Sequence, residues 1–333
     1  MPEAAAAAQR RPLPGPKPVR SAAVTSVGAA LPDTVVTSAE IAEHLGIDEH
    51  WILKRVGIRE RRRLAEDETL AELATAAGRT ALERAGIAAT DLDLVICATQ
   101  TGDAVTPATS SMIAHHLGAG EIATFDVGAA CAGYLTGLSV AASQIESGRA
   151  EHALVIGCEA MSRVLDSDDR RTAALFGDGA GASVVSVRES GVGVGPSVFH
   201  SAGEHERLVY VPRGGDGRLQ MEGQETFTFA VRALASATRE VLERAELGLD
   251  DIDVFAYHQA NGRITSALGA RLDLGDDPRV LNTIETTGNT SAASIPLALD
   301  DAYRRGQLQA GSRVLMASIG AGYVWGAMIV DWG

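Results

Sequence analysis

The chain repeats a segment of its own sequence. Residues 81–102, ALERAGIAATDLDLVICATQTG, align without gaps with residues 241–262, VLERAELGLDDIDVFAYHQANG. Residues 131–148 align in the same way with residues 289–306, and each of these segments precedes an apolar stretch, HALVIG or RVLMASIG. Helix, turn, DxD and strand keep their order in both copies, which favours a repeated supersecondary unit over chance similarity between alanine-rich helices.

Within each copy, helical segments alternate with short apolar segments. Residues 68–86 and 133–148 predict helices, and residues 91–100, 121–128 and 152–159 predict strands. This alternation predicts an α/β fold with helices packed on a largely parallel sheet. The repeat predicts two halves packed as a pseudo-dimer within one chain. We expect a disordered leader over residues 1–18, a first half over residues 19–188 and a second half over residues 189–333.

Composition excludes several classes of protein. The chain has 333 residues, 46% hydrophobic, and a formal net charge of −14, so a large core is possible and binding to nucleic acid or to anionic lipid is disfavoured. Its three cysteines have no metal-ligand spacing, and their low, odd number predicts free thiols in a reducing compartment. We find no secretory signal and no apolar run of about 18 residues. We therefore expect a cytoplasmic protein that does not cross a membrane.

Three polar residues occupy related places in this repeat. The alignment places Cys131 and Asn289 at matching points, each where a strand gives way to a helix. His258 follows the strand VFAY and matches Ala98 in the first copy. Because open α/β sheets bind ligands beyond the carboxyl ends of their strands, the three side chains are expected to converge.

Cys131 stands in FDVGAACAGYLTGL, among small residues and at the start of a predicted helix. The positive end of a helix dipole favours the thiolate form of a cysteine, and small neighbours leave room for a thioester and expose backbone N–H groups. The alternative is a buried structural cysteine, which is our interpretation of Cys97 and Cys158.

His258 and Asn289 have alternative explanations as well. A histidine after a strand is often structural, and Asn289 in GNTSAAS is suited to cap the next helix. Two rival chemistries lack their motifs: there is no GxSxG elbow of a serine hydrolase, and no GxGxxG followed by an acidic residue at dinucleotide-binding spacing.

Seven segments, in order, resemble the β-ketoacyl-acyl-carrier-protein synthase III family of the thiolase superfamily. The similarity extends from about Val19 to Trp332, and the seven segments read WILKRVGIRERR, DVGAACAGY, LFGDGAGASVV, MEGQETFTFAV, HQANGRI, GNTSAAS and GAGYVWG. The resemblance implies a five-layered αβαβα thiolase-like fold and a homodimer. It also implies that Cys131 is the nucleophile that accepts the acyl group, and that His258 and Asn289 bind the thioester carbonyl of the extender.

The resemblance further implies a binding site for coenzyme A. Trp51 and Arg170 resemble the residues that sandwich the adenine, and Arg55 stands where the nucleotide end is held. Arg263 resembles the arginine that meets the acidic carrier protein or the phosphates. Four further arginines either extend this basic patch or form a solvated face: Arg59, Arg61, Arg62 and Arg63.

The reaction implied has two half-reactions and needs neither a metal nor a permanently bound cofactor, since coenzyme A thioesters are substrates. Cys131 attacks an acyl-CoA, with backbone N–H groups at Cys131 and near Ala321 as the oxyanion hole. Malonyl-acyl carrier protein then loses carbon dioxide, and its enolate condenses with the acyl-enzyme. The product is a β-ketoacyl thioester, of fatty-acid or of specialised, polyketide-type metabolism.

Three positions depart from the family pattern. Ile319 replaces a phenylalanine beside the active-site cleft. Thr106 replaces a phenylalanine that crosses the dimer to close the partner's acyl pocket, which suggests a primer larger than acetyl. Ala270 precedes Arg271, so one half of a basic pair on the carrier-docking face is missing.

Relatives that pass the acyl group to an alcohol or amine without decarboxylation remain the alternative, although they often replace the asparagine that is present here as Asn289. A degradative thiolase would need a second cysteine, which ASIGAGYVWG lacks. Hydroxymethylglutaryl-CoA synthases need a glutamate base, for which Glu83 and Glu159 are not obviously placed. A catalytically silent binding subunit would lack Cys131.

Overall fold

The computed structural model describes residues 20–188, 193–214 and 216–333. The leader expected over residues 1–18 lies outside these ranges. The boundary expected between residues 188 and 189 falls where the last strand of the first sheet ends, next to residues that are not described, so it stays a prediction. Among the described residues, none of the helices combines the length and the hydropathy needed to cross a membrane.

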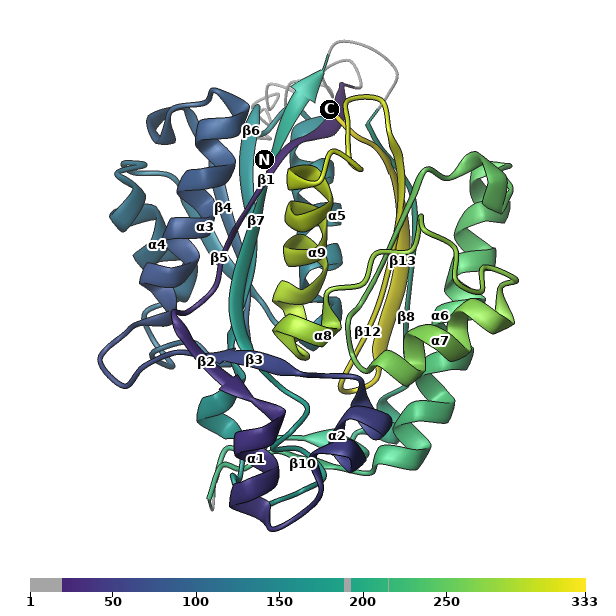
Figure 1. The fold of residues 1–333 in the computed structure, drawn as a ribbon. Coiled ribbons are helices and arrows are strands. Elements are labelled where there is room, and N and C mark those ends of the chain that lie inside the picture. Colours follow the sequence, from purple (N-terminus) through teal and green to yellow (C-terminus); the bar gives the residue numbers. More distant parts are fainter. Residues whose placement is uncertain (1–19, 189–192, 215) are drawn as a thin grey trace, which may run out of the picture.

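The first sheet has five strands in the order β1-β7-β6-β4-β5 (Figure 1). Strand β4 runs parallel to β5 and to β6, whereas β7 runs antiparallel to β6 and to β1. The strands are β1 (Ser21–Ala30), β4 (Leu94–Ala98), β5 (Ala123–Val127), β6 (His152–Ala160) and β7 (Asp178–Arg188).

The second sheet repeats this order with four strands, β8-β13-β12-β11. Strands β11 and β12 are parallel, and the other two pairs are antiparallel. The strands are β8 (Val194–Ser201), β11 (Val254–Tyr257), β12 (Arg313–Gly320) and β13 (Val324–Asp331). The expectation of largely parallel sheets is therefore wrong, because β6 leads to β7, and β12 to β13, without a crossover helix.

Helices and sheets form five layers (Figure 1). Helices α3 and α4 cover the outer face of the first sheet, α6 and α7 cover the outer face of the second, and α5 and α9 lie between the sheets. The outer helices are α3 (Leu70–Ala85), α4 (Thr109–Leu117), α6 (Gly223–Ala245) and α7 (Gly262–Arg271). The central helices are α5 (Gly133–Glu146) and α9 (Ser294–Arg304).

Smaller elements cover one end of these layers, on the side where α9 begins (Figure 1). They are β2 (Thr34–Thr37), α1 (Ser38–Leu45), α2 (Glu49–Val56), β3 (Glu60–Arg63), β9 (Val209–Tyr210), β10 (Gln220–Met221) and α8 (Ile284–Thr287). Strand β2 pairs with β3, and β9 pairs with β10. Helix α1 begins with a capping box formed by Thr37 and Glu40.

The DxD motif does the same work in both halves, which confirms that the repeat is structural. Asp93 donates its N–H to the carbonyl of His152, and its side chain accepts from the His152 N–H. Asp253 bonds Arg313 in the same two ways. Each aspartate thus ties the strand that follows a short 3-10 turn to the strand beside it.

The second pair of aligned segments needs a correction. A short 3-10 turn precedes each central helix, Ala130–Ala132 before α5 and Ser291–Ala293 before α9. The first residue of each turn is left-handed, with φ of 44° at Ala130 and 50° at Ser291. Cys131 therefore corresponds to Ala292, and the predicted match between Cys131 and Asn289 is wrong.

The cause of this error is a difference in helix length. Helix α5 has 14 residues and α9 has 11, so an alignment without gaps that matches the C-terminal ends misplaces the N-terminal ends. Asn289 also follows the short helix α8 rather than a strand.

The turn before α9 packs on the first sheet at Gly157 of β6. A Cβ atom at this position would lie 2.2 Å from the carbonyl oxygen of Ala292. We expect Gly157→Ala to lower the free energy of unfolding by about 2 kcal/mol, because a backbone clash forces the layers apart. Gly223→Ala, where a Cβ meets nothing within 4 Å, should change stability by less than about 0.5 kcal/mol. Urea denaturation of both variants tests this expectation, which equal stabilities would contradict.

Candidate active site

Cys131 lies in the turn between β5 and α5, held closely against the end of β12. Its carbonyl accepts a hydrogen bond of 2.7 Å from the Ser318 hydroxyl. A Cβ atom on Gly320 would lie 2.7 Å from the Cys131 nitrogen, so only glycine permits this approach. The backbone that continues into Ala321 therefore passes beside the Cys131 backbone. This approach supports the predicted pairing of the two N–H groups, which remains a prediction.

The segment 289–294 brings the second half of the chain to Cys131. The Cys131 thiol donates to the Ser291 hydroxyl over 3.4 Å. The Asn289 side-chain oxygen accepts from the Ser291 N–H at 2.9 Å, while its backbone pairs with Leu175 and Gly177. Asn289 thus caps the turn, as the alternative explanation supposed, and its amide NH₂ remains as a hydrogen-bond donor.

His258 is buried at the end of β11 and is bound at two points. Its backbone N–H donates to the carbonyl of Ala317 at 2.9 Å, and its ring nitrogen Nδ1 lies 2.6 Å from the Ser294 hydroxyl. The Gln259 N–H donates to the same hydroxyl oxygen. The assignment that satisfies both contacts has Ser294 donating its hydrogen to Nδ1, which leaves the hydrogen of the neutral ring on Nε2.

One short segment therefore connects the three predicted residues. Ser291 contacts Cys131, Ser294 contacts His258, and Asn289 begins the segment. Gln259 fixes the neighbouring turn, since its amide bonds the carbonyls of Tyr257 and Leu281 and the N–H of Thr283. The turn after β5, the residue after β11 and the segment that leads into α9 meet at one place, as the sequence predicted.

Burial determines the protonation states of the Cys131 thiol and the His258 ring. Desolvation raises the pKa of the Cys131 thiol to about 12; the Ser291 contact opposes this shift, and the charge of Glu159 adds to it. Desolvation thus opposes the thiolate form that the helix dipole was expected to favour. Desolvation lowers the pKa of His258 to about 3, so its ring is neutral.

The sequence did not single out Ser291, Ser294 or Glu159 as members of the site. Glu159 is fully buried on β6, and its carboxylate accepts from Ser291 at 3.1 Å. Ser291 and Ser294 are three residues apart in GNTSAAS, and the turn before α9 aims them at Cys131 and His258. That spacing after Asn289 was the available signal. No sequence signal connected Glu159 with Ser291.

The residues predicted to hold coenzyme A lie on two elements and a loop. Trp51 and Arg55 are on α2, where the guanidinium of Arg55 lies 5.1 Å from the centre of the Trp51 ring. Arg170 is exposed between β6 and β7, and its pairing with Trp51 stays a prediction. Arg263 on α7 lines a cavity of about 630 Å³ together with Lys54 of α2. Helices α2 and α7 therefore border the same groove.

The arginine cluster of β3 divides into buried and exposed members. Arg61 is buried and donates to the carbonyls of Val36 and Ala174 and to the Ser38 hydroxyl. Desolvation lowers its pKa to about 10. Arg61 is thus a structural cation outside any surface patch. Arg59 forms an ion pair with Glu285.

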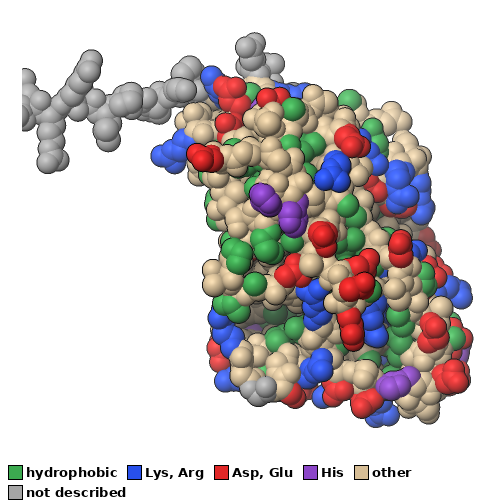
Figure 2. All heavy atoms as spheres, turned by 90° about the vertical axis from the view of Figure 1, so that its left-hand side faces the viewer, with side chains coloured by type: hydrophobic (Ala, Val, Ile, Leu, Met, Phe, Trp, Pro, Cys, Tyr) green, Lys and Arg blue, Asp and Glu red, His purple; other side chains and the backbone are tan. Residues whose placement is uncertain are grey.

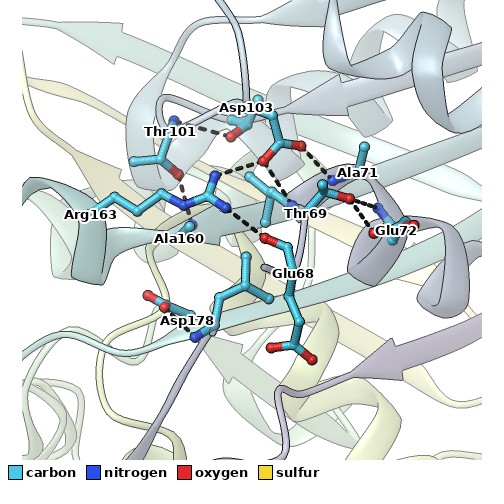
Figure 3. Close-up of polar contacts among 12 residues, drawn as sticks. Glu68, Thr69, Ala71, Glu72, Thr101, Asp103, Ala160, Arg163 and Asp178 are labelled. Carbon is cyan, nitrogen blue, oxygen red and sulfur yellow. Dashed lines mark hydrogen bonds and ion pairs between the residues drawn. The ribbon is translucent and has the colours of Figure 1, made fainter. Parts of the chain in front are cut away.

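The two predicted acyl-pocket residues lie in different surroundings. Ile319 is buried in the apolar cluster between the second sheet and α6. Thr106 is exposed in the loop after β4. Asp103 anchors this loop, since its carboxylate accepts from the first N–H groups of α3 and pairs with Arg163 at 2.6 Å (Figure 3). Both pocket assignments stay predictions.

The other cysteines fit their structural interpretation. Cys97 and Cys158 are fully buried on neighbouring strands, with their sulfur atoms 3.4 Å apart. Within residues 20–188, 193–214 and 216–333, no three His, Cys, Asp or Glu side chains gather as a possible metal site.

Two repeated halves with a cysteine, a histidine and an asparagine between them define a thiolase-like condensing enzyme. Family models of 3-oxoacyl-[acyl-carrier-protein] synthase III match residues 125–203, and models of its C-terminal part match residues 242–332. The chain is 46% identical over 318 residues to the β-ketoacyl-[acyl-carrier-protein] synthase III of Rhizorhabdus wittichii, an alignment that covers 94% of this chain and 99% of that protein. The chain belongs to the β-ketoacyl-acyl-carrier-protein synthase III family.

Solved structures agree with this assignment. The 3-oxoacyl-[acyl-carrier-protein] synthase III of Aquifex aeolicus superimposes with a TM-score of 0.90 at 37% identity, covering 93% of this chain and 100% of that one. The priming β-ketosynthase of the R1128 polyketide biosynthetic pathway gives a TM-score of 0.92 at 38% identity, covering 96% and 98%. The predicted fold class and family are thereby confirmed.

The buried neutral ring of His258 should make stability depend on pH. Its pKa is depressed in the folded chain to about 3 from an ordinary value of 6.5, so between these values only the unfolded chain binds the proton. Stability should then fall as pH decreases from about 6.5, by up to about 1.4 kcal/mol per pH unit from this group. Urea denaturation between pH 4 and pH 7 measures the slope, which His258→Gln should reduce and the exposed His116→Gln should leave unchanged. An unchanged slope in His258→Gln would contradict the assignment.

Proposed function

We propose that this chain initiates carbon-chain synthesis by decarboxylative condensation. An acyl-CoA acylates Cys131, and the acyl-enzyme then condenses with malonyl-acyl carrier protein to give a β-ketoacyl thioester and carbon dioxide. The observation that carries this proposal is the segment 289–294, which contacts Cys131 through Ser291 and His258 through Ser294. The family relationship supplies the class of substrate.

The acylation step uses Cys131 and the backbone around it. The sulfur forms a bond to the acyl carbonyl carbon, and coenzyme A leaves as its thiol or thiolate. The close approach at Gly320 supports an oxyanion hole made by the N–H groups of Cys131 and Ala321. Such donors stabilise the tetrahedral oxyanion because they are fixed before the reaction.

The condensation step uses two neutral donors. Loss of carbon dioxide from the malonyl group leaves an enolate, whose oxygen needs hydrogen-bond donors in a dry site. Nε2–H of His258 and the Asn289 amide NH₂ are such donors, and both are held by bonds to their other polar atoms. A neutral histidine suits this role because it cannot protonate the enolate as readily as an imidazolium would.

Substrate access is proposed along the groove between α2 and α7. Trp51, Arg55 and Arg170 would hold the nucleotide end of coenzyme A, and Arg263 at the cavity wall would meet phosphates or the acidic carrier. Coenzyme A thioesters are then substrates, and we propose no permanently bound cofactor. We place the enzyme in the cytoplasm.

A homodimer is proposed through the open edge of the first sheet. Within the part of the chain that the structure describes, β5 pairs with β4 alone, and it carries the half-exposed Phe125. Val105, with 91% of its surface exposed, lies in the loop next to Thr106. Figure 2 shows the neighbouring face, which α3 and α4 cover, and apolar side chains gather there beside histidines.

We expect sedimentation of the full chain to report the mass of two chains, because an open strand edge with exposed apolar residues favours pairing. Phe125→Glu should shift the population toward a single chain by charging the edge. A single-chain mass for the unmodified protein would contradict the homodimer.

Two variants separate the proposed half-reactions. Cys131→Ala should abolish acylation by acyl-CoA, which intact mass spectrometry detects. Asn289→Ala should retain acylation but lower release of labelled carbon dioxide from malonyl-acyl carrier protein by about 10²–10³-fold, since one enolate donor is lost. Condensation at the wild-type rate in Asn289→Ala would contradict its role.

The same assay decides between condensation and transfer without decarboxylation. Release of carbon dioxide together with a β-ketoacyl product supports the proposal, and a panel of acyl-CoA primers reports the size of the acyl pocket near Thr106 and Ile319. An acylated Cys131 that releases no carbon dioxide would instead indicate transfer to an alcohol or amine.

A further inference from the structure

A buried carboxylate without a role in either half-reaction lies beside the nucleophile. Glu159 of β6 has no exposed surface, yet four donors surround it. Its Oε2 accepts from the hydroxyls of Thr101 and Thr99, at 2.5 and 3.2 Å, and from the Gln100 N–H at 3.1 Å. Its Oε1 accepts from the Ser291 hydroxyl at 3.1 Å.

The directions of these bonds follow from their neighbours. The Ala160 N–H donates to the Thr101 hydroxyl oxygen at 2.8 Å (Figure 3), and the Thr101 N–H donates to the Thr99 hydroxyl oxygen at 3.2 Å. Each threonine therefore has its own hydrogen free to point at Glu159. Four donors around a buried carboxyl offset the loss of water from its ionised form.

Ser291 connects this carboxylate to the reacting sulfur. The Cys131 thiol donates to the Ser291 hydroxyl oxygen, and the Ser291 hydroxyl donates to Glu159. Ser291 is itself held in a left-handed conformation, with its N–H bonded to Asn289. The three side chains form a directed path along which each group donates to the next.

His258 is not arranged to accept the proton of the Cys131 thiol. Its Nδ1 accepts from Ser294, so the hydrogen lies on Nε2 and the ring has no free lone pair for a thiol proton. Burial raises the pKa of the Glu159 carboxyl, which improves it as a proton acceptor. The charge of Glu159 also contributes to raising the pKa of the Cys97 thiol, after the hydrogen bond with Cys158 and burial.

We propose that Ser291 and Glu159 relay the proton of the Cys131 thiol during acylation, an inference that rests on the proposed role of Cys131 as acyl carrier. As the sulfur bonds to the acyl carbon, the S–H proton passes to the Ser291 oxygen and the Ser291 proton passes to Oε1 of Glu159. Coenzyme A departs as a thiolate and takes a proton from water. Condensation later expels the Cys131 thiolate, which recovers the stored proton by the reverse path.

The test is the pH dependence of single-turnover acylation, followed by rapid quench and mass spectrometry. The unmodified enzyme should acylate at a rate that is level around neutral pH and falls in acid as Glu159 becomes protonated. In Ser291→Ala only thiol ionised by solvent can react, so the rate should drop about 10²-fold or more at pH 7. The rate should then rise about tenfold per pH unit, because burial keeps the pKa of the thiol well above neutral pH. Glu159→Gln should give the same profile.

The matched control is Ser26→Ala, which removes another buried serine hydroxyl that donates to a buried acceptor, the Ala81 carbonyl at 2.7 Å. It lies on β1, outside the site, and should keep the level profile. Thermal unfolding checks that all variants fold. For the unmodified enzyme, a plot of the acylation rate against the fraction of D₂O should be curved, because two protons are transferred in the same step.

Each outcome supports or overturns the relay. The relay would be overturned if Ser291→Ala acylated at the wild-type rate with a level pH profile. It would also be overturned if the acylation rate of the unmodified enzyme were the same in H₂O and in D₂O. Either result would leave Cys131 as the acyl carrier. Absence of acylation in the unmodified enzyme with any acyl-CoA would instead overturn the proposed function itself.

Discussion

The burial of α5 and α9 between two sheets is the constraint on which the site depends. Both helices pack into one apolar cluster that takes side chains from both sheets, so neither helix can shift without separating the layers. Each begins with a turn whose first residue is left-handed, Ala130 or Ser291, a conformation that costs about 1 kcal/mol for a residue other than glycine. Packing outweighs this cost. The result is that Cys131 and Ser291, 160 residues apart in sequence, lie in contact.

Withdrawal from water then sets the chemistry of each group in the site. A thiol, an imidazole and a carboxyl are all desolvated, and each responds by favouring its neutral form. At Glu159 four hydrogen-bond donors oppose this shift, because they stabilise the ionised form of the carboxyl. A protonated thiol beside a hydrogen-bonded carboxylate is a nucleophile that needs a route for its proton. A neutral imidazole beside it is a donor, and it is therefore suited to an enolate rather than to a thiol.

The sequence predicted the fold class, the repeat, the central helices and the convergence of Cys131, His258 and Asn289, because each of these depends on local pattern or on family motifs. Prediction from the sequence failed for the features that long-range packing determines. The strand directions of β7 and β13 depend on hairpin-like connections that apolar runs do not reveal. The match of Cys131 to Asn289 failed because α9 is shorter than α5. The desolvation that opposes a Cys131 thiolate cannot be read from a motif. Glu159 is one acidic residue in an apolar strand, and only the packing of residues 291–293 against that strand brings the Ser291 hydroxyl to it.

The two halves use the same contact for different purposes. Strand pairing sets Ala153 of β6 and Val314 of β12 in equivalent places beside β4 and β11, and counting along the strands makes Glu159 equivalent to Gly320. Likewise Ser291 is equivalent to Ala130. Each of these two pairs takes one residue from each half. In the first pair, Glu159 and Ser291, a carboxylate bonds a hydroxyl. In the second pair, Gly320 and Ala130, a Cβ atom on the glycine would lie 2.9 Å from that of Ala130. The small pair lets the backbone of β12 approach the backbone of Cys131, and the polar pair places a carboxylate two hydrogen bonds away from the Cys131 sulfur. One position cannot be at once empty and charged. Because the contact between the halves occurs twice, one copy can be small and the other polar.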